Sequence, residues 1–247
     1  MHSPLRDDNS DRSPVYYRLQ KILLNKIESG QWEPGALIPT EREMVKEYGV
    51  STGTVKKAVL NLVQDGFLYR IQGRGTFVAG TTLRPESLRY YRYLSGFNGI
   101  EADLTIEFMD LSLVKDIDYV REQLDTKKGE CFYKLNRVFM NGEKPLVYCS
   151  SYYPQSIFPG FDEIPQTRFE KIPVYLIIEK YYGMPTIHNH ELFSSVSADK
   201  TVAEILHVSE GTAMLDIDML SFTYRNRPYE YRKSYCITGE ERILRET

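Results

Sequence analysis

The chain has 247 residues, of which 42% are hydrophobic and 26% charged, and its formal net charge is −3. These proportions are typical of a globular protein, and no apolar run approaches the ~18 residues that a membrane helix needs. The polar start MHSPLRDDNSDRSP lacks the apolar segment of a secretory signal. The three cysteines, Cys131, Cys149 and Cys236, are too far apart for a disulfide framework or a close-spaced metal site. We therefore expect an intracellular, cytoplasmic protein.

Charge is divided unevenly along the chain. Residues 14–80 contain nine Lys and Arg against six Asp and Glu, whereas residues 81–247 contain twenty against twenty-five. A basic segment in front of an acidic one indicates that any nucleic-acid contact lies in the first segment. Residues 1–13 are rich in Asp, Ser and Arg, and we expect them to form a disordered tail.

The first helix is predicted after Pro14, where Tyr16, Leu19, Leu23 and Ile27 recur at helical spacing. The following stretch, ESGQWEPG, contains two glycines and a proline, which end that helix. The first structural element is therefore a single amphipathic helix with a marked stop.

Two further helices and a hairpin follow. PTEREMVKEYG predicts a helix with a capping box, because Thr40 precedes it, Glu43 comes three residues later, and Gly49 stands past its end. Ser51 can cap a third helix. The predicted inward side of that helix is formed by Val55, Ala58, Val59 and Leu62. GFLYR and TFVAG then indicate two short strands around IQGRG.

This order of elements outlines a winged helix-turn-helix, in which the second helix of the pair enters the DNA major groove. Hydroxyl groups and a glycine at a helix start let the backbone approach phosphates, and cations on the helix and wing add attraction. The residues that this reasoning selects are Ser51, Thr52, Gly53, Thr54, Lys56, Lys57, Arg70 and Arg74. Each has a simpler interpretation, namely a helix cap, a solvated face or an ordinary turn. Their combination in this order favours DNA binding.

The pattern changes from about residue 81. We predict a linker over 81–93 and a second domain over 94–247. Strands are predicted at 104–114, 131–140, 146–153, 186–198, 213–224 and 229–238, and helices at 118–124, 174–183 and 201–208. Runs of strands joined by turns such as NGEKP and RNRP, with helices between them, indicate an α+β domain on an antiparallel sheet.

Residues 14–80 resemble the N-terminal domain of GntR-type bacterial transcription regulators. The matching features are P-x-Y, I-x-S-G-x-x-x-P-G, P-T-E-R-E, G-V-S-x-x-T-V and the wing Q-G-R-G-T-F-V. The remainder resembles the UTRA effector-binding domain of the HutC branch, whose fold is similar to chorismate lyase. The motifs for this second resemblance are LSGF, GEKPLVYCSSYYP, VYLIIEKYYG, VSEGTAML and RPYEYRKSYC.

The first resemblance implies DNA contacts from the arginine of PTERE, the start of the recognition helix and the wing tip. The implied residues are Arg42, Ser51, Thr52, Gly53, Thr54, Lys56, Gln72 and Gly73. Thr52 and Lys56 stand where the family usually has arginines, of which the first reads guanine. Because neither side chain can make a bidentate guanidinium contact, we expect the guanine preference at that position to be weakened or changed.

The second resemblance implies an effector pocket with contributions from Asn98, Gly99, Arg137, Tyr175 and Glu230. Three positions are less polar than in the sugar-phosphate readers of the branch, namely Phe139, Cys149 and Cys236. Because a single arginine is a weak site for a doubly charged phosphate, we expect an organic acid or another small metabolite instead.

Other roles are open for these polar residues. Arg137 can form an ion pair on a strand face, and Glu230 can pair with Arg232 or Lys233 at the surface. His188 and His190 are spaced to face one side of a strand, but without a third ligand we predict no metal site.

The sequence thus predicts a ligand-responsive transcriptional regulator, expected to be a repressor, that binds a palindromic operator as a homodimer. The linker is expected to transmit the response, with Arg84, Arg89 and Arg92 as interdomain contacts. One alternative is a DNA-binding regulator without ligand response, and another is a lyase-like enzyme. The enzyme alternative lacks a nucleophile–base signature or a cofactor motif, so we predict no catalytic residue and no cofactor.

Overall fold

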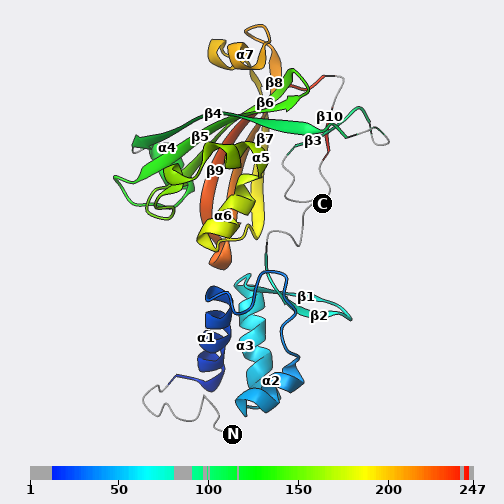
Figure 1. Cartoon of the computed structure of the whole chain (residues 1–247), viewed down its shortest axis with the longest axis vertical. Coiled ribbons are helices and arrows are strands. Elements are labelled where there is room, and N and C mark those ends of the chain that lie inside the picture. The colour runs from blue at the N-terminus through cyan, green and yellow to red at the C-terminus, as the bar shows by residue number, and fades with distance from the viewer. Residues whose placement is uncertain are drawn as a thin grey trace.

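The computed structural model describes residues 13–80, 91–96, 99, 101–115, 117–239 and 242–244. A helical N-terminal part with a small hairpin stands beside one end of a larger C-terminal part built on a sheet (Figure 1). Residues 1–12 of the predicted tail, residues 81–90 of the predicted linker and Asn98 lie outside the described residues. Within the described part of the chain, no helix is both long and apolar enough to cross a membrane.

The N-terminal part has the predicted winged helix-turn-helix arrangement. Its helices are α1 (Val15–Glu28), α2 (Glu41–Tyr48) and α3 (Thr52–Gln64), and its wing pairs β1 (Leu68–Ile71) with β2 (Gly75–Val78). The predicted capping box is confirmed, since the Glu43 N–H donates to Thr40 Oγ1 and the Thr40 N–H donates to the Glu43 carboxylate. The predicted cap of α3 is also confirmed, because the Thr54 N–H donates to Ser51 Oγ.

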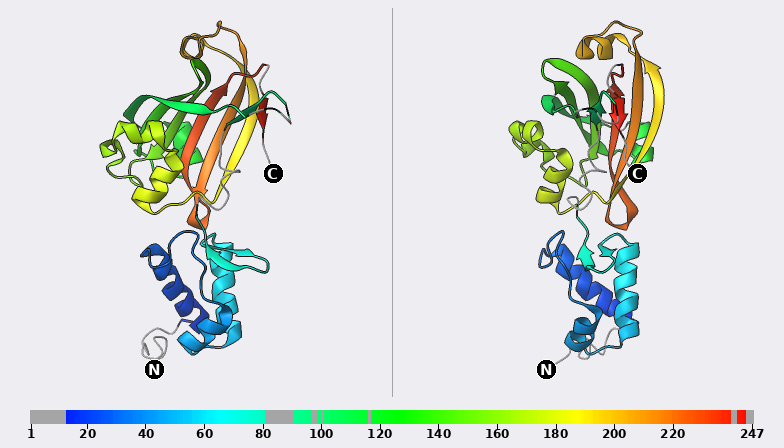
Figure 2. Two further views of the ribbon diagram at one scale, coloured as in Figure 1. Left: turned by 45° about the vertical axis from the view of Figure 1, so that its right-hand side comes forward. Right: turned by 90° about the vertical axis from the view of Figure 1, so that its right-hand side faces the viewer.

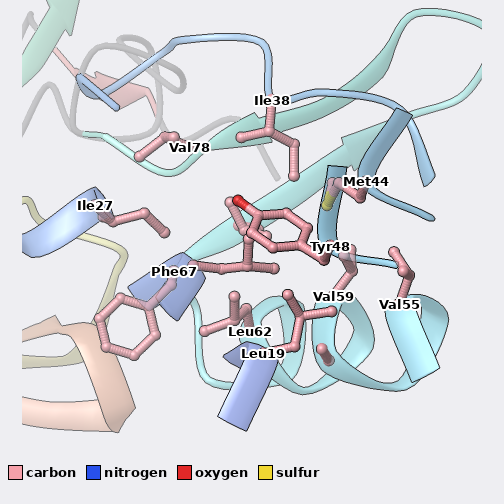
Figure 3. Packing of buried hydrophobic residues seen from close by; sticks show 13 residues of the cluster. Leu19, Ile27, Ile38, Met44, Tyr48, Val55, Val59, Leu62, Phe67 and Val78 are labelled. Atoms are coloured by element: carbon pink, nitrogen blue, oxygen red, sulfur yellow. The ribbon is translucent and has the colours of Figure 1, made fainter. Parts of the chain in front are cut away.

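One hydrophobic core holds this part together (Figure 3). The predicted inward side of α3 is buried, with Val55, Ala58, Val59 and Leu62 each at most 1% exposed. These side chains meet Leu19 of α1 and Tyr48 of α2. Burying each large aliphatic side chain contributes roughly 1.5–3 kcal/mol, so this core fixes the direction in which α3 presents its polar start.

The C-terminal part is a six-stranded antiparallel sheet, which confirms the predicted α+β class. The strands in spatial order are β4 (Leu104–Lys115), β5 (Cys131–Asn141), β6 (Lys144–Pro154), β9 (Arg227–Cys236), β8 (Ala213–Thr223) and β7 (His188–Ser197). All six predicted strands are present. The short pair β3 (Arg92–Leu94) and β10 (Arg242–Leu244) was not predicted from the sequence.

The two faces of the sheet carry different helices (Figure 2). The predicted helices α4 (Asp118–Gln123) and α7 (Lys200–Leu206) contribute to clusters on one face. On the other, called the inner face below, lie α6 (Val174–Tyr182), also predicted, and the unpredicted α5 (Gln166–Lys171) and η2 (Phe161–Glu163). The final short helix η3 (Tyr224–Asn226) closes the β8–β9 hairpin.

The end of the predicted linker belongs to the C-terminal packing. Tyr93 is fully buried and Tyr91 is 8% exposed, and both pack in a cluster with side chains of the inner face. Arg92, expected to contact the other domain, instead pairs with Glu101 at 3.0 Å. These residues anchor the chain where it enters the C-terminal part.

Candidate functional site

The start of α3 and the wing expose nearly all the residues predicted to contact DNA. Thr54 is half-buried because its hydroxyl contacts Ser51, and the others are exposed. The exposed set comprises Arg42, Ser51, Thr52, Gly53, Lys56, Lys57, Arg70, Gln72, Gly73 and Arg74. A Cβ added to Gly53 would meet only Ser51 Oγ, at 3.8 Å, so the helix start is open to an approaching backbone.

Two of the predicted cations already have partners within the protein. The Lys57 ammonium lies 3.9 Å from the centre of the Tyr16 ring on α1, and an Arg70 guanidinium nitrogen lies 3.2 Å from a Glu41 carboxylate oxygen. Lys56, in contrast, makes no hydrogen bond or ion pair with the described residues. Lys56 is therefore the better candidate for a phosphate contact on α3.

The wing owes its shape to a close approach. Gly73 and Gly75 both have positive φ, at 74° and 129°, and the Arg74 N–H closes the turn on the Ile71 carbonyl. A Cβ on Gly75 would lie 2.6 Å from a Leu37 methyl carbon, so a larger residue would displace the exposed Leu37 side chain, and the φ of 129° itself favours glycine at this position. The backbone conformation of the turn therefore fixes the direction in which the wing tip presents Gln72 and Arg74.

A cavity of about 290 Å³ lies on the inner face of the C-terminal sheet. It brings together two predicted effector residues, Arg137 from β5 and Tyr175 from α6. The full lining is Tyr91, Glu101, Ala102, Asp103, Leu104, Ile106, Arg137, Phe139, Pro173, Val174 and Tyr175. Gly99 is not part of this lining, since it lies in a turn whose N–H donates to the Gly96 carbonyl. Sequence reasoning missed Tyr91 and the two acidic residues in the wall.

Arg137 is the distinctive group of this cavity. Its side chain is buried, with 1% exposure, and its Nε and one terminal nitrogen have no hydrogen-bond partner among the described residues. The alternative ion pair on a strand face is not observed there. Its guanidinium lies 5.6 Å from the Phe139 ring centre. The wall opposite includes the start of α6, where Pro173 provides no side-chain cap and the helix dipole is positive. Both features favour an anion.

Glu230 lies behind the cavity as a buried carboxylate, fully enclosed rather than at the surface. It accepts hydrogen bonds from the Tyr153 hydroxyl at 2.8 Å, from Ser221 Oγ at 3.1 Å, and from two Arg232 nitrogens at 3.0 and 2.6 Å. Burial raises the pKa of this carboxyl, but the Arg232 charge, the Tyr153 bond and the Arg137 charge together hold the pKa below its usual value. Glu230 is therefore ionised at neutral pH.

The charges under the cavity do not balance. On the inner face, the buried charged side chains that are described are the two cations Arg137 and Arg232 and the single anion Glu230. Lys233 faces the opposite side, where it binds Asp216 and Asp218. Among these buried groups the cations exceed the anions by one, and the carboxylates of Glu101 and Asp103 also line the cavity.

The histidine pair has an aromatic environment. The rings of His188 and His190 lie 4.7 and 4.6 Å from the Phe222 ring centre and 5.2 Å from each other. Among the described residues there is no group of three side chains that could hold a metal ion.

Comparison with known proteins matches both parts of the chain to described families. Residues 15–78 match the family described as bacterial regulatory proteins, gntR family, and residues 101–239 match the UTRA domain. The transcriptional regulator YurK of Bacillus subtilis (strain 168) is 28% identical over 221 residues, which cover 90% of both chains. The transcriptional repressor NagR of the same organism is 27% identical over 228 residues, covering 90% of this chain and 89% of NagR.

A solved structure shows the same fold over nearly the whole chain. The possible transcriptional regulator YydK from Bacillus subtilis subsp. subtilis str. 168 aligns with a TM-score of 0.54 and 20% identity. The alignment covers 94% of this chain and 98% of YydK.

Proposed function

Because the chain belongs to the gntR family of bacterial regulatory proteins and carries a UTRA domain, we propose that it is a repressor controlled by a small organic acid bound at Arg137. It is a DNA-binding transcriptional regulator, with residues 14–80 proposed as the DNA-binding domain and residues 94–247 as the effector domain. The similarity to NagR, a transcriptional repressor, supports repression. A regulator of this kind would act on a palindromic operator in the cytoplasm.

The proposal of an organic acid rests on one observation, namely that the Arg137 guanidinium has nitrogens without a hydrogen-bond partner among the described residues. Arg137 is among the residues that line the cavity, and a buried polar group without a partner costs about 1–3 kcal/mol, so a ligand that reaches and satisfies this guanidinium is favoured. A carboxylate matches the fork of a guanidinium with two parallel hydrogen bonds. The single excess positive charge suits a monoanion better than the dianion of a sugar phosphate.

A thermal-shift screen tests this proposal, because a ligand that binds the native state raises the melting temperature. The panel contains monocarboxylic acids, dicarboxylic acids, sugars and sugar phosphates. We expect monocarboxylic acids to give the largest shifts, and a sugar phosphate in first place would overturn the ligand class. A mobility-shift assay with the strongest binder then decides between a ligand-responsive regulator and one without response.

We expect Lys56→Ala to weaken DNA binding and to reduce its salt dependence. Loss of one phosphate contact lowers the slope of log affinity against log salt by about 1. The measurement is fluorescence anisotropy with a random-sequence duplex, so no operator needs to be known. Lys128→Ala, in an exposed loop of the effector domain, is the control and leaves the slope unchanged. An unchanged slope for Lys56→Ala would remove this lysine from the DNA interface.

We propose that two chains pair through β7, the last strand of the sheet. Both faces of this edge strand are exposed in its middle, with Leu192 at 72% and Phe193 at 49% exposure. An open, apolar edge is a template for pairing with a second strand. We expect Leu192→Lys combined with Phe193→Lys to convert the dimer to a monomer, measured by light scattering after gel filtration. Leu113→Lys on β4, at the opposite edge, serves as control and keeps the dimer.

A further inference from the structure

The β8–β9 hairpin reaches out of the effector domain and touches the DNA-binding domain. Its closing turn η3 lies next to the helical part in both views (Figures 1 and 2). The Tyr224 ring stacks on Phe67 with 4.3 Å between ring centres, and its hydroxyl donates to the Ala79 carbonyl at 3.2 Å. The neighbouring Arg225 N–H donates to the Asp65 carbonyl at 2.9 Å. This turn is a defined point of attachment between the two domains.

The residues that the turn contacts lie at the ends of the DNA-binding elements. Asp65 is the C-cap of α3, and Phe67 lies directly before the first wing strand. Ala79 follows the last residue of the second wing strand. The turn therefore holds the end of the recognition helix and both ends of the wing at the same time.

The turn places Arg225 in a backbone conformation that arginine seldom adopts. Arg225 and Asn226 have φ values of 59° and 54°, in the left-handed region that two-residue hairpins usually fill with Asn-Gly. The Arg225 guanidinium lies 5.5 Å from the Phe67 ring centre and 4.0 Å from Glu28 of α1. Strained residues persist where the surroundings determine them, and here the surroundings include the other domain.

The contact between the domains also encloses open space. A cavity of about 490 Å³ lies beside the turn, lined by Val63, Gly66, Leu68, Tyr69, Arg70, Ala79, Gly80, Thr186, Ile187 and His188. Domains joined by a small interface can move relative to one another unless particular contacts hold them. Losing Tyr224 would therefore remove the ring stack on Phe67 and the bond to Ala79 from this attachment.

The base of the same hairpin includes Glu230, the buried carboxylate behind the effector cavity. Ser221 of β8 and Glu230 of β9 are register partners joined by a hydrogen bond, and the register shifts directly beyond them on the side of the turn. Glu230 in turn binds Arg232, whose Nε donates to Ser151 Oγ of β6, the strand that pairs with β5 and its Arg137. The Arg137 charge also lowers the pKa of Glu230. An anion at Arg137 would cancel part of the positive charge that acts on Glu230.

We propose that the turn Tyr224–Asn226 is a latch that positions the DNA-binding domain, and that an anion at Arg137 acts on it through Glu230 and the base of the hairpin. The second half rests on the proposed function. A ligand regulates DNA binding only if it binds two arrangements of the protein with different affinity. The attached and released states of the latch provide two such arrangements.

Trp32 gives a direct test of the latch. It is the single tryptophan of the chain and packs against the N-terminal core, so its fluorescence reports unfolding of the DNA-binding domain. We expect Tyr224→Ala to lower the Trp32 melting midpoint by about 5 °C or more, the scale of losing one ordinary tertiary contact in a domain of this size. Tyr224→Phe keeps the ring stack and gives a smaller shift. Tyr181→Ala, a half-exposed tyrosine on α6, leaves the midpoint unchanged.

A double-mutant cycle tests the link to the cavity without any ligand or DNA. Arg137→Met removes the same charge that a bound anion would neutralise. We expect it to shift the Trp32 midpoint in the wild-type background and to have no effect in the Tyr224→Ala background. If Tyr224→Ala leaves the Trp32 midpoint unchanged, the latch is wrong. If the shifts caused by Tyr224→Ala and Arg137→Met add in the double variant, the proposed link between the cavity and the latch is wrong. Because neither DNA nor a metabolite is used, these failures are distinct from a failure of the proposed function.

Discussion

Replacing Arg137 by methionine is expected to abolish stabilisation by organic acids without destabilising the ligand-free effector domain. The guanidinium is buried, and its Nε and one terminal nitrogen have no partner among the described residues. Truncating one partner of a buried charge pair costs about 2–5 kcal/mol of binding, so affinity should fall by about 30-fold or more. In the empty protein the same replacement removes an unsatisfied cation and leaves Glu230 paired with Arg232.

The measurement combines calorimetric titration of the strongest acid from the screen with thermal unfolding of the empty protein. Arg168→Met, an exposed arginine on α5, is the matched control and keeps both affinity and melting temperature. A variant that binds as tightly as the wild type would show that the ligand site lies elsewhere. A ligand-free variant whose effector domain melts well below that of the wild type would instead give Arg137 a structural role.

Local features of this fold were predictable because the signals lie within a few residues of one another. The capping box at Thr40 and Glu43 and the cap at Ser51 are complete within one helical turn. The six long strands have runs of apolar or alternating residues that extend over most of their length. In contrast, α5 has six residues, too few to display a helical period, and β3 and β10 are three-residue strands that pair across the whole domain.

The chemistry of the cavity depends on contacts that no local pattern contains. The sequence left Glu230 with two possible partners, and the alternation of β9 decides between them, because Arg232 shares its face and Lys233 does not. Strand alternation alone could have made that choice. The unpaired state of Arg137 and the stacking of Tyr224 on Phe67 depend instead on residues far apart in the chain.

Glu230→Gln is expected to destabilise the effector domain strongly. The variant keeps the shape of the side chain but leaves Arg137 and Arg232 buried without a counter-charge. Removing one partner of a buried ion pair costs about 3–5 kcal/mol, which lowers the melting temperature by roughly 10 °C for a protein of this size. Glu47→Gln breaks the exposed pair with Lys26, which is 3.1 Å long, and serves as control with a loss of about 0–1 kcal/mol.

The difference in melting temperature between wild type and Glu230→Gln should depend on pH if the buried charge causes it. The pKa of Glu230 is lowered in the folded protein, so its contribution to stability is fully present above the unfolded pKa of about 4.3. The contribution is lost as the pH falls through the lower folded pKa, because a protonated Glu230 resembles glutamine. Melting curves of wild type and Glu230→Gln should therefore converge on acidification below about pH 4. Curves that stay equally far apart at every pH would assign the loss to hydrogen-bond geometry rather than to the buried charge.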